Sequence, residues 1–345
     1  MSGVQPADPA RIGVTGSIAS DHLMTFPGSF AEVLMPDKLD KVALSFLVDD
    51  LEIRRGGVGA NIGFGLGLLG LSPVLIGAVG ADFTEHELWL KQHGVDTSGV
   101  RVSDRRHTAR FVCTTDRDHN QIATFYAGAM AEARHIRLTE VAQRVGSFHL
   151  TIISPNDPEA MVSHTEECRD EGYAFLADPS QQLARADGDT ARILVEGAAG
   201  LFTNEYERQL LAQKTGWSQE EILGKVGMWV TTLGASGAEV RRRGEGPVTV
   251  PSVPPRQAAD PTGAGDAFRA GFIAGQAWDL GDERSAQLGC LLATLALESV
   301  GPQEYQLDRD DWLKRFAAAY GDTAAADIEP RLPAGPGELA AAEPA

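Results

Sequence analysis

The sequence contains few cysteines, and they show no pairing pattern. Cys113, Cys168 and Cys290 are the three cysteines among 345 residues, and none belongs to a CxxC motif. Disulfide frameworks and zinc sites both need sets of cysteines at short, regular spacings. The sequence therefore argues against both and favours a reducing compartment, which we expect to be the cytoplasm.

Long apolar runs and a secretion signal are also missing. No apolar segment approaches the roughly 20 residues that cross a bilayer. Residues 1–10 are polar, include two prolines and lack the basic and apolar regions of a signal peptide. We expect this segment to be a flexible N-terminus, and we expect no membrane partner.

Positive charge is scarce. The chain has 30 Lys and Arg residues against 48 Asp and Glu residues, which gives a net charge of −18. Such a charge repels phosphate backbones and anionic membranes unless a local basic patch intervenes. The one compact basic run, residues 241–243, is more simply explained as the end of a solvated strand. We therefore expect no nucleic-acid partner.

Strand patterns alternate with helical patterns through most of the chain. A helical pattern follows each of four apolar strand-like runs, at residues 73–79, 148–153, 174–177 and 200–203. This alternation is typical of a mainly parallel sheet covered by helices on both faces. We predict one large α/β nucleotide-binding domain, formed by residues 11–18, 55–103 and 128–321.

Other strand patterns interrupt this alternation. Apolar residues alternate over 42–53, and segments 108–115 and 121–126 flank a polar turn, as in a hairpin. We assign residues 19–54 and 104–127 to a separate small β lid. Residues 322–345 are rich in Ala, Pro, Gly and Glu without a sustained pattern, so we expect a flexible tail there.

The most informative segment is residues 260–266 (DPTGAGD), which lead into an apolar helical pattern. Gly263 and Gly265 allow the backbone to approach a ligand closely. A helix start gathers unpaired N–H groups and positive dipole, which suits an anion such as a phosphoryl group. The dipole would help keep Asp266 ionised, and an ionised acid there can accept the proton of an attacking hydroxyl. The alternative is a glycine-rich helix cap with no chemistry.

This segment resembles the second signature of the ribokinase-like (phosphofructokinase-B type) carbohydrate kinases. Residues 55–63 (RGGVGANIG) resemble their first signature, a Gly-Gly turn followed by an Asn-bearing helix, and the resemblance covers roughly residues 11–320. It implies a ribokinase-like fold with a β-sheet lid, and ATP and Mg²⁺ as cofactors. It also implies that Asp266 is the catalytic base and that the amides of Gly263, Ala264 and Gly265 hold the transferred group.

The first signature suits a sugar. Gly57 lets the backbone fold against it, and Asn61 offers a donor and an acceptor to ribose hydroxyls, although a helix cap is the alternative for Asn61. Residues 65–70 also satisfy GxGxxG. They lie within a helical pattern without a preceding strand, which disfavours a Rossmann dinucleotide site.

The resemblance extends to the subgroup of bacterial adenosine kinases. The segments that carry it are residues 15–23, 44–50, 107–111, 156–161 and 178–185. It implies adenosine as the substrate, with the ribose beside Ser17, Asp21, Gly57 and Asn61. It also implies that Phe111 and Phe125 contact the adenine, a role that suits aromatic faces; plain lid packing is their alternative.

The nucleotide side lacks a P-loop, because the sequence has no GxxxxGK[ST]. Other segments match the family's nucleotide elements instead. By the resemblance, Glu207 and, indirectly, Asn204 would organise magnesium beside the phosphates. The other implied nucleotide contacts are Gln181, Gln182, Asn204, Thr232, Gly234, Gly237 and Gly265. Asp260 and Thr262 match part of the family's monovalent-cation site, which implies potassium.

These observations predict an ATP-dependent adenosine kinase acting on the ribose 5′-hydroxyl. Another sugar or nucleoside kinase of the family is the nearest alternative, and a non-catalytic ligand-binding regulator is an alternative of a different class. Paired lid strands could cover one another's edges. Together with the family resemblance, this implies a homodimer through the lid.

Overall fold

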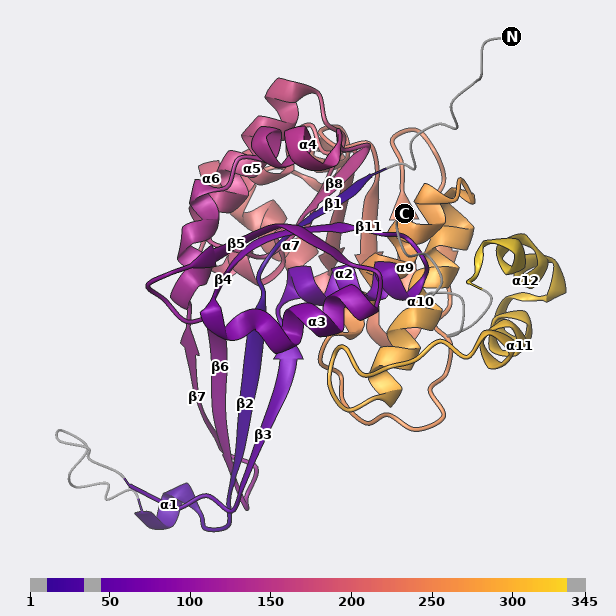
Figure 1. The fold of residues 1–345 in the computed structure, drawn as a ribbon. Coiled ribbons are helices and arrows are strands. Elements are labelled where there is room, and N and C mark those ends of the chain that lie inside the picture. The colour runs from indigo at the N-terminus through magenta and orange to yellow at the C-terminus, as the bar shows by residue number, and fades with distance from the viewer. Residues whose placement is uncertain (1–10, 34–44, 334–345) are drawn as a thin grey trace, which may run out of the picture.

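Two β-sheets organise the computed structural model, which describes residues 11–33 and 45–333 (Figure 1). The larger sheet has nine strands in the order β13-β12-β11-β10-β9-β8-β1-β4-β5. From β11 to β5 every neighbouring pair is parallel, and β12 and β13 add antiparallel strands at one edge. Its strands are β1 (Ile12–Thr15), β4 (Val74–Gly80), β5 (Asp96–Ser103), β8 (Leu150–Ile153), β9 (Phe175–Ala177), β10 (Gly200–Asn204), β11 (Trp229–Thr232), β12 (Ala238–Arg241) and β13 (Val248–Val250).

Helices cover both faces of this sheet (Figure 1). One cluster of buried apolar side chains packs α2 (Val58–Leu68), α3 (Thr84–Gln92), α9 (Ala264–Ala277), α10 (Gly281–Glu298), α11 (Arg309–Tyr320) and α12 (Asp322–Ile328). A second cluster packs α4 (Leu138–Val145), α5 (Pro158–Glu171), α6 (Gly188–Val195), α7 (Glu205–Thr215) and α8 (Gln219–Leu223). Strand β9 shows why both are needed: Leu176 belongs to the first cluster, and Phe175 and Ala177 belong to the second. Successive strand residues face opposite sides, so both faces of the strand are buried, and the predicted mainly parallel, helix-covered sheet is confirmed.

The smaller sheet forms the predicted lid. Its order is β3-β2-β6-β7, and its strands are β2 (Ala19–Phe26), β3 (Asp50–Gly56), β6 (Ala109–Asp116) and β7 (Gln121–Tyr126). In Figure 1 these strands extend away from the helices, with α1 (Phe30–Val33) at their far end. The hairpin expected at 108–126 is present as β6 and β7.

The strand expected over 42–53 is wrong in part. Residues 42–44 lie outside the described residues, 45–49 are not in a strand, and β3 begins only at Asp50. Phe46 instead packs against Phe26 and Phe30, with ring centroids 4.7 Å and 5.4 Å away. Phe46, one of the alternating apolar residues, thus belongs to an aromatic cluster at the tip of the lid. A period-two pattern does not distinguish such a cluster from a paired strand.

The C-terminal region also differs from the expected flexible tail at 322–345. Helix α12 and a short 3-10 helix (Glu329–Arg331) follow α11, and Ala324 and Ile328 are buried in the core. Alanine favours helices, and the buried side chains of Ala324 and Ile328 hold α12 against the core. Residues 1–10 and 334–345, also expected to be flexible, lie outside the described residues. Within 11–33 and 45–333, no helix is long and apolar enough to cross a membrane.

Candidate active site

Helix α9 begins directly after the glycine-rich segment. Its N-cap, Gly263, has φ 80°, and a Cβ there would lie 2.4 Å from the Cβ of Pro302. Both the left-handed conformation and the close approach therefore require glycine. Within the described residues, the N–H groups of Gly265 and Asp266 have no hydrogen-bond acceptor. The helix start thus presents free donors to an anion.

Asp266 meets Asn61 where α9 packs against α2. The Nδ2 of Asn61 donates to Oδ2 of Asp266 over 2.8 Å, although the two residues are 205 positions apart. Burial raises the pKa of the Asp266 carboxyl, while the nearby Arg269 charge and the Asn61 hydrogen bond lower it, and the net direction is upward. The helix dipole alone led us to expect a carboxylate held ionised, but burial outweighs that stabilisation. A raised pKa makes Asp266 a stronger base than an exposed carboxylate.

Arg269 lies one helical turn beyond Asp266. Its Nη1 donates to the carbonyl of Gly265 over 2.9 Å, and it forms a buried ion pair with Asp178, with Nη2 to Oδ1 at 2.6 Å. Burial raises the pKa of Asp178 to about 6, although Arg269 opposes this rise. Neither residue was predicted as a site residue. The hydrogen bond to Gly265 ties Arg269 to the first turn of α9, and the ion pair with Asp178 holds its guanidinium in place there.

The Gly-Gly turn closes tightly on the chain that follows β1. Gly57 has φ 94°, and a Cβ there would lie 2.6 Å from the backbone N of Ala19. Ser17 supports the turn, because its Oγ accepts a hydrogen bond from the N–H of Val58 over 3.0 Å. The sequence predicted Ser17 and Gly57 beside a sugar, and the structure places them together at the base of the lid.

Asn61 is more constrained than predicted. Besides donating to Asp266, it accepts at Oδ1 from Nε2 of Gln303 over 2.9 Å, and its side chain is buried. It is therefore not a helix cap, and its free capacity for ribose hydroxyls is smaller than the sequence suggested. Gln303 was missed, because residues 301–305 (GPQEY) match no motif and reach Asn61 only through the fold.

Three predicted substrate residues form one row across the lid. Asp21 on β2 pairs with Phe111 on β6, which in turn pairs with Phe125 on β7. Residues directly opposite on neighbouring strands share a face, so a carboxylate and two aromatic rings project from the same side of the sheet. Burial raises the pKa of Asp21 to about 6; the charge of Arg54 opposes this rise and that of Asp260 adds to it. Arg54 pairs with Asp21 across β2 and β3 and donates to Asp260 over 2.9 Å, so this side of the lid faces the glycine-rich segment.

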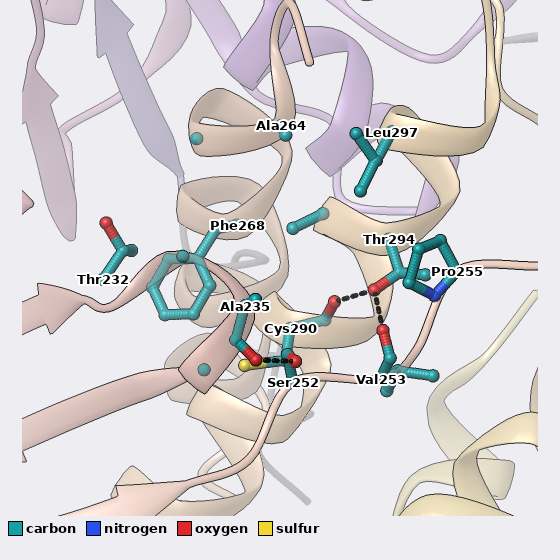
Figure 2. A pocket seen from close by; sticks show the side chains of 14 residues that line it. Thr232, Ala235, Ser252, Val253, Pro255, Ala264, Phe268, Cys290, Thr294 and Leu297 are labelled. Carbon is teal, nitrogen blue, oxygen red and sulfur yellow. Dashed lines mark hydrogen bonds between the residues drawn. The ribbon is translucent and has the colours of Figure 1, made fainter. Parts of the chain in front are cut away.

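A cavity of about 360 Å³ opens beside the start of α9 (Figure 2). Five of its lining residues were predicted as site residues: Thr232, Gly234, Gly237, Ala264 and Gly265. The sequence did not identify the others, which are Ala235, Ser252, Val253, Pro255, Phe268, Cys290, Ala293, Thr294 and Leu297. Several lie on α9 and α10, where an apolar side chain that lines a cavity has the same sequence pattern as one in the core.

The wall of this cavity is mainly apolar. Two of its hydroxyl groups donate to backbone carbonyls: Ser252 Oγ to Ala235 O over 2.6 Å and Thr294 Oγ1 to Val253 O over 2.8 Å (Figure 2). An apolar slot with a few polar groups suits a flat base. Because Ala264 and Gly265 belong to both the cavity and the helix start, a nucleotide base in the cavity would place its phosphates at the free amides.

Asn204 and Glu207 form a capping box at the start of α7. The N–H of each residue donates to the side chain of the other over 2.8 Å. Gln182 is also engaged, with Nε2 donating to the carbonyl of Asn156 over 3.0 Å, whereas Gln181 is exposed. None of these four residues lines the cavity, so their predicted nucleotide contacts stay predictions.

Asp260 and Thr262 precede the helix start. Asp260 accepts at Oδ1 from the N–H of Thr262 and at Oδ2 from Nη1 of Arg54, both over 2.9 Å. Burial raises the pKa of Asp260, but these hydrogen bonds and the Arg54 charge outweigh burial and leave it low. A lid guanidinium thus contacts the carboxylate assigned to a monovalent cation.

A dedicated metal cage is not part of this site. Across the described parts of the chain, no group of three or more His, Cys, Asp or Glu side chains could hold a metal ion. Magnesium does not need such a cage, because it is commonly held by one or two carboxylates together with substrate phosphates. Glu207 is the candidate carboxylate, and Ser180 Oγ donates to its Oε1 over 3.2 Å.

The fold and this site define a ribokinase-like α/β kinase with a β lid. Residues 30–309 match the pfkB family carbohydrate kinase model. The chain belongs to the pfkB family of carbohydrate kinases.

Known relatives agree with this assignment. The nucleoside kinase of Burkholderia thailandensis in ligand-free form is 36% identical with a TM-score of 0.80, and the match covers 89% of this chain and 100% of that chain. The same enzyme has been solved with inosine and with ADP-inosine. The nucleoside kinase of Methanothermobacter thermautotrophicus is 29% identical over 303 residues, 85% of this chain and 94% of that protein. Ribokinase from Cryptococcus neoformans with ADP, at 19% identity and a TM-score of 0.74 over 89% of this chain and 99% of that chain, shows the fold alone.

Proposed function

We propose that this protein is an ATP-dependent nucleoside kinase that phosphorylates the ribose 5′-hydroxyl of adenosine to give AMP and ADP. The single observation that carries the proposal is the row formed by Asp21, Phe111 and Phe125 on one face of the lid. A carboxylate can accept from the vicinal hydroxyls of a ribose, and aromatic faces can hold a base. The nucleoside kinases related to this chain, one of them solved with inosine, support the same substrate class.

Asp266 is the proposed general base. It would take the proton of the 5′-hydroxyl as that oxygen attacks the γ-phosphoryl group in line. Because the transition state of phosphoryl transfer is loose, the protein contributes mainly by positioning and by stabilising charge. Of the three amides predicted to hold the phosphoryl oxygens, those of Gly263 and Gly265 would do so together with that of Asp266, whereas the N–H of Ala264 already donates to the carbonyl of Pro261 over 3.3 Å. The guanidinium of Arg269 lies beside this turn of the helix.

The cofactor roles follow the same arrangement. ATP would place its base in the cavity lined by Thr232, Gly234 and Gly237, with its phosphates at the start of α9. Magnesium would be held by those phosphates near Glu207, with Asn204 acting indirectly. Potassium is the proposed monovalent cation near Asp260 and Thr262. When bound, magnesium supplies charge neutralisation at the phosphates.

The choice among nucleosides depends on contacts beyond the two aromatic rings. Two aromatic rings accept any base, because every base has a π-face. A single experiment separates the candidates: ADP release in a coupled assay with adenosine, inosine, guanosine, cytidine, ribose and fructose. We expect the highest kcat/KM for adenosine and low values for the bare sugars. Highest activity with ribose or fructose would overturn the nucleoside assignment, and no ADP release with any acceptor would favour a non-catalytic regulator.

The outer face of the lid supports a homodimer. Leu51, Ile53 and Ile122 are 53%, 60% and 42% exposed, and the strand register places them on the face opposite Asp21. A second copy would bury these side chains and cover the edge strands β3 and β7. A cytoplasmic location is supported by Cys113, Cys168 and Cys290, which are free and buried.

A further inference from the structure

We propose that Gln303 and His86 are positioning residues that fix the amide of Asn61 and, through it, the carboxylate of Asp266. The inference rests on the proposed function, because it assumes that Asp266 is the base. Neither residue belongs to a family signature described above, and both reach the site through the fold. Their role is to hold one hydrogen-bond chain that ends on the reacting group.

This hydrogen-bond chain joins residues from four separate segments of the protein. The Nε2 of His86 on α3 lies 3.0 Å from Oε1 of Gln303, which lies between α10 and α11. Gln303 Nε2 donates to Oδ1 of Asn61 on α2 over 2.9 Å, and Asn61 Nδ2 donates to Oδ2 of Asp266 on α9 over 2.8 Å. Gln303 is 0% exposed and Asn61 is 5% exposed, so the bond between them is shielded from water, whereas His86 and Asp266 at the two ends are partly exposed.

The direction of the hydrogen-bond chain follows from its inner end: the carboxylate of Asp266 accepts from Asn61, the oxygen of Asn61 then accepts from Gln303, and the oxygen of Gln303 faces His86. Burial lowers the pKa of His86 to about 4, although its contact with Gln303 opposes this, and the nearby Arg55 charge lowers it further. His86 is therefore neutral near pH 7. An amide oxygen can only accept, so Nε2 of His86 carries the proton and donates to Gln303.

The same logic fixes Asn61. With its Oδ1 occupied by the NH₂ group of Gln303, Asn61 presents its own NH₂ group to Asp266. If the Asn61 amide were reversed, its oxygen would face the carboxylate, and two acceptors would repel each other. Every donor in this hydrogen-bond chain points toward Asp266. Consecutive hydrogen bonds that run in the same direction polarise and strengthen one another.

The hydrogen-bond chain affects both the protonation and the orientation of the Asp266 carboxylate. The hydrogen bond from Asn61 opposes the rise that burial causes in the pKa of Asp266. It engages Oδ2, whereas in the described residues no side-chain donor contacts Oδ1, which leaves that oxygen for the substrate proton. The other charged or titratable groups facing Asp266 are Arg269, Asp178 and Tyr305, and none of them belongs to the chain.

The test compares Gln303→Met with a matched control. Methionine keeps the length of the side chain but removes both hydrogen bonds. Gln287→Met is the control, because Gln287 is 4% exposed and bonds to Arg284 and Glu283 instead. For Gln303→Met we expect kcat to fall about 10- to 100-fold. The acidic limb of the pH profile should shift to higher pH, and the KM for ATP should stay within twofold. Gln287→Met should leave kcat and the limb unchanged.

A second pair of variants guards against a folding defect in Gln303→Met. His86→Phe removes the outer donor, whereas His86→Gln restores one, so His86→Phe should reproduce the shift of the acidic limb and His86→Gln should rescue it in part. Asp266→Asn serves as the reference for the base itself. If Asp266→Asn is inactive while Gln303→Met and His86→Phe keep the wild-type kcat and acidic limb, the positioning role is wrong and the base assignment stands. If Asp266→Asn keeps normal turnover, Asp266 is not the base, and the positioning role that depends on it is rejected as well.

Discussion

Phe125→Ala offers a direct way to separate base binding from phosphate transfer. Phe125 is 54% exposed, so it contributes little to the packing of the lid, and its ring is available to a ligand. A phenylalanine buries about 200 Å² when fully covered, so a nucleobase would cover about 100 Å² of it. At about 25 cal/mol per Å², this contact is worth about 2.5 kcal/mol.

Alanine retains part of that contact, so the expected loss is about 2 kcal/mol, which corresponds to about a 30-fold increase in KM for adenosine. This agrees with the 1–3 kcal/mol typical of base–aromatic stacking. The KM for ATP should change less than twofold, because the cavity beside α9 is separate from the lid row. Steady-state kinetics from ADP release, with each substrate varied in turn, provide both values.

Tyr126→Ala is the matched control. Tyr126 is the next residue on β7, is 46% exposed and projects from the opposite face of the lid. Its loss should leave the KM for adenosine within twofold of wild type. Equal effects of Phe125→Ala on both substrates, or an equally large effect of Tyr126→Ala on adenosine, would refute the stacking assignment.

Further predictions concern pH, cations and assembly. Asp21 has a pKa of about 6, so we expect its protonation to add a limb near pH 6 to kcat/KM for adenosine. Asp21→Asn should remove this limb and leave the acidic limb of kcat, which we assign to Asp266. Because burial disfavours the ionised form in the folded state, Asp21→Asn should raise the Tm at pH 7 by a few degrees. This gain should shrink as the pH falls through 6, and a lower Tm at pH 7 would contradict it. Potassium should give a higher rate than tetramethylammonium at equal ionic strength; equal rates would mean that Arg54 takes the place of the cation at Asp260. Ile53→Glu should convert a dimer to a monomer by light scattering, and a monomeric wild type would reject the lid interface.

Much of the fold was predictable because its signals are local. The buried strands β4 and β8 are short apolar runs, and residues 260–266 carry glycines and Asp266 within one helical turn. Periodicity and motif reasoning succeed in such places, since each segment specifies its own conformation. The register that pairs Asp21 with Phe111 could not be read from the sequence, and their predicted contacts with a substrate stay predictions.

The parts that could not be predicted depend on distant contacts. Gln303 reaches Asn61 across 242 positions, and Arg269 reaches Asp178 across 91. Phe268 has the pattern of a core residue, yet it lines the cavity beside α9. Helix α12 lacks a strong pattern and owes its place to two buried apolar contacts, at Ala324 and Ile328. A single sequence carries no signal that reports such tertiary contacts.

The most direct test of the central claim is the turnover and nucleoside affinity of Asp266→Asn. Asparagine preserves the size of the side chain and can still accept the hydrogen bond from Asn61, but it cannot take a proton at neutral pH. We expect kcat from ADP release to fall at least about 10²-fold, while the calorimetric Kd for adenosine stays within about tenfold and circular dichroism shows a folded protein. A folded variant with near-normal turnover would contradict the assignment of Asp266 as the base, and with it the proposed mechanism.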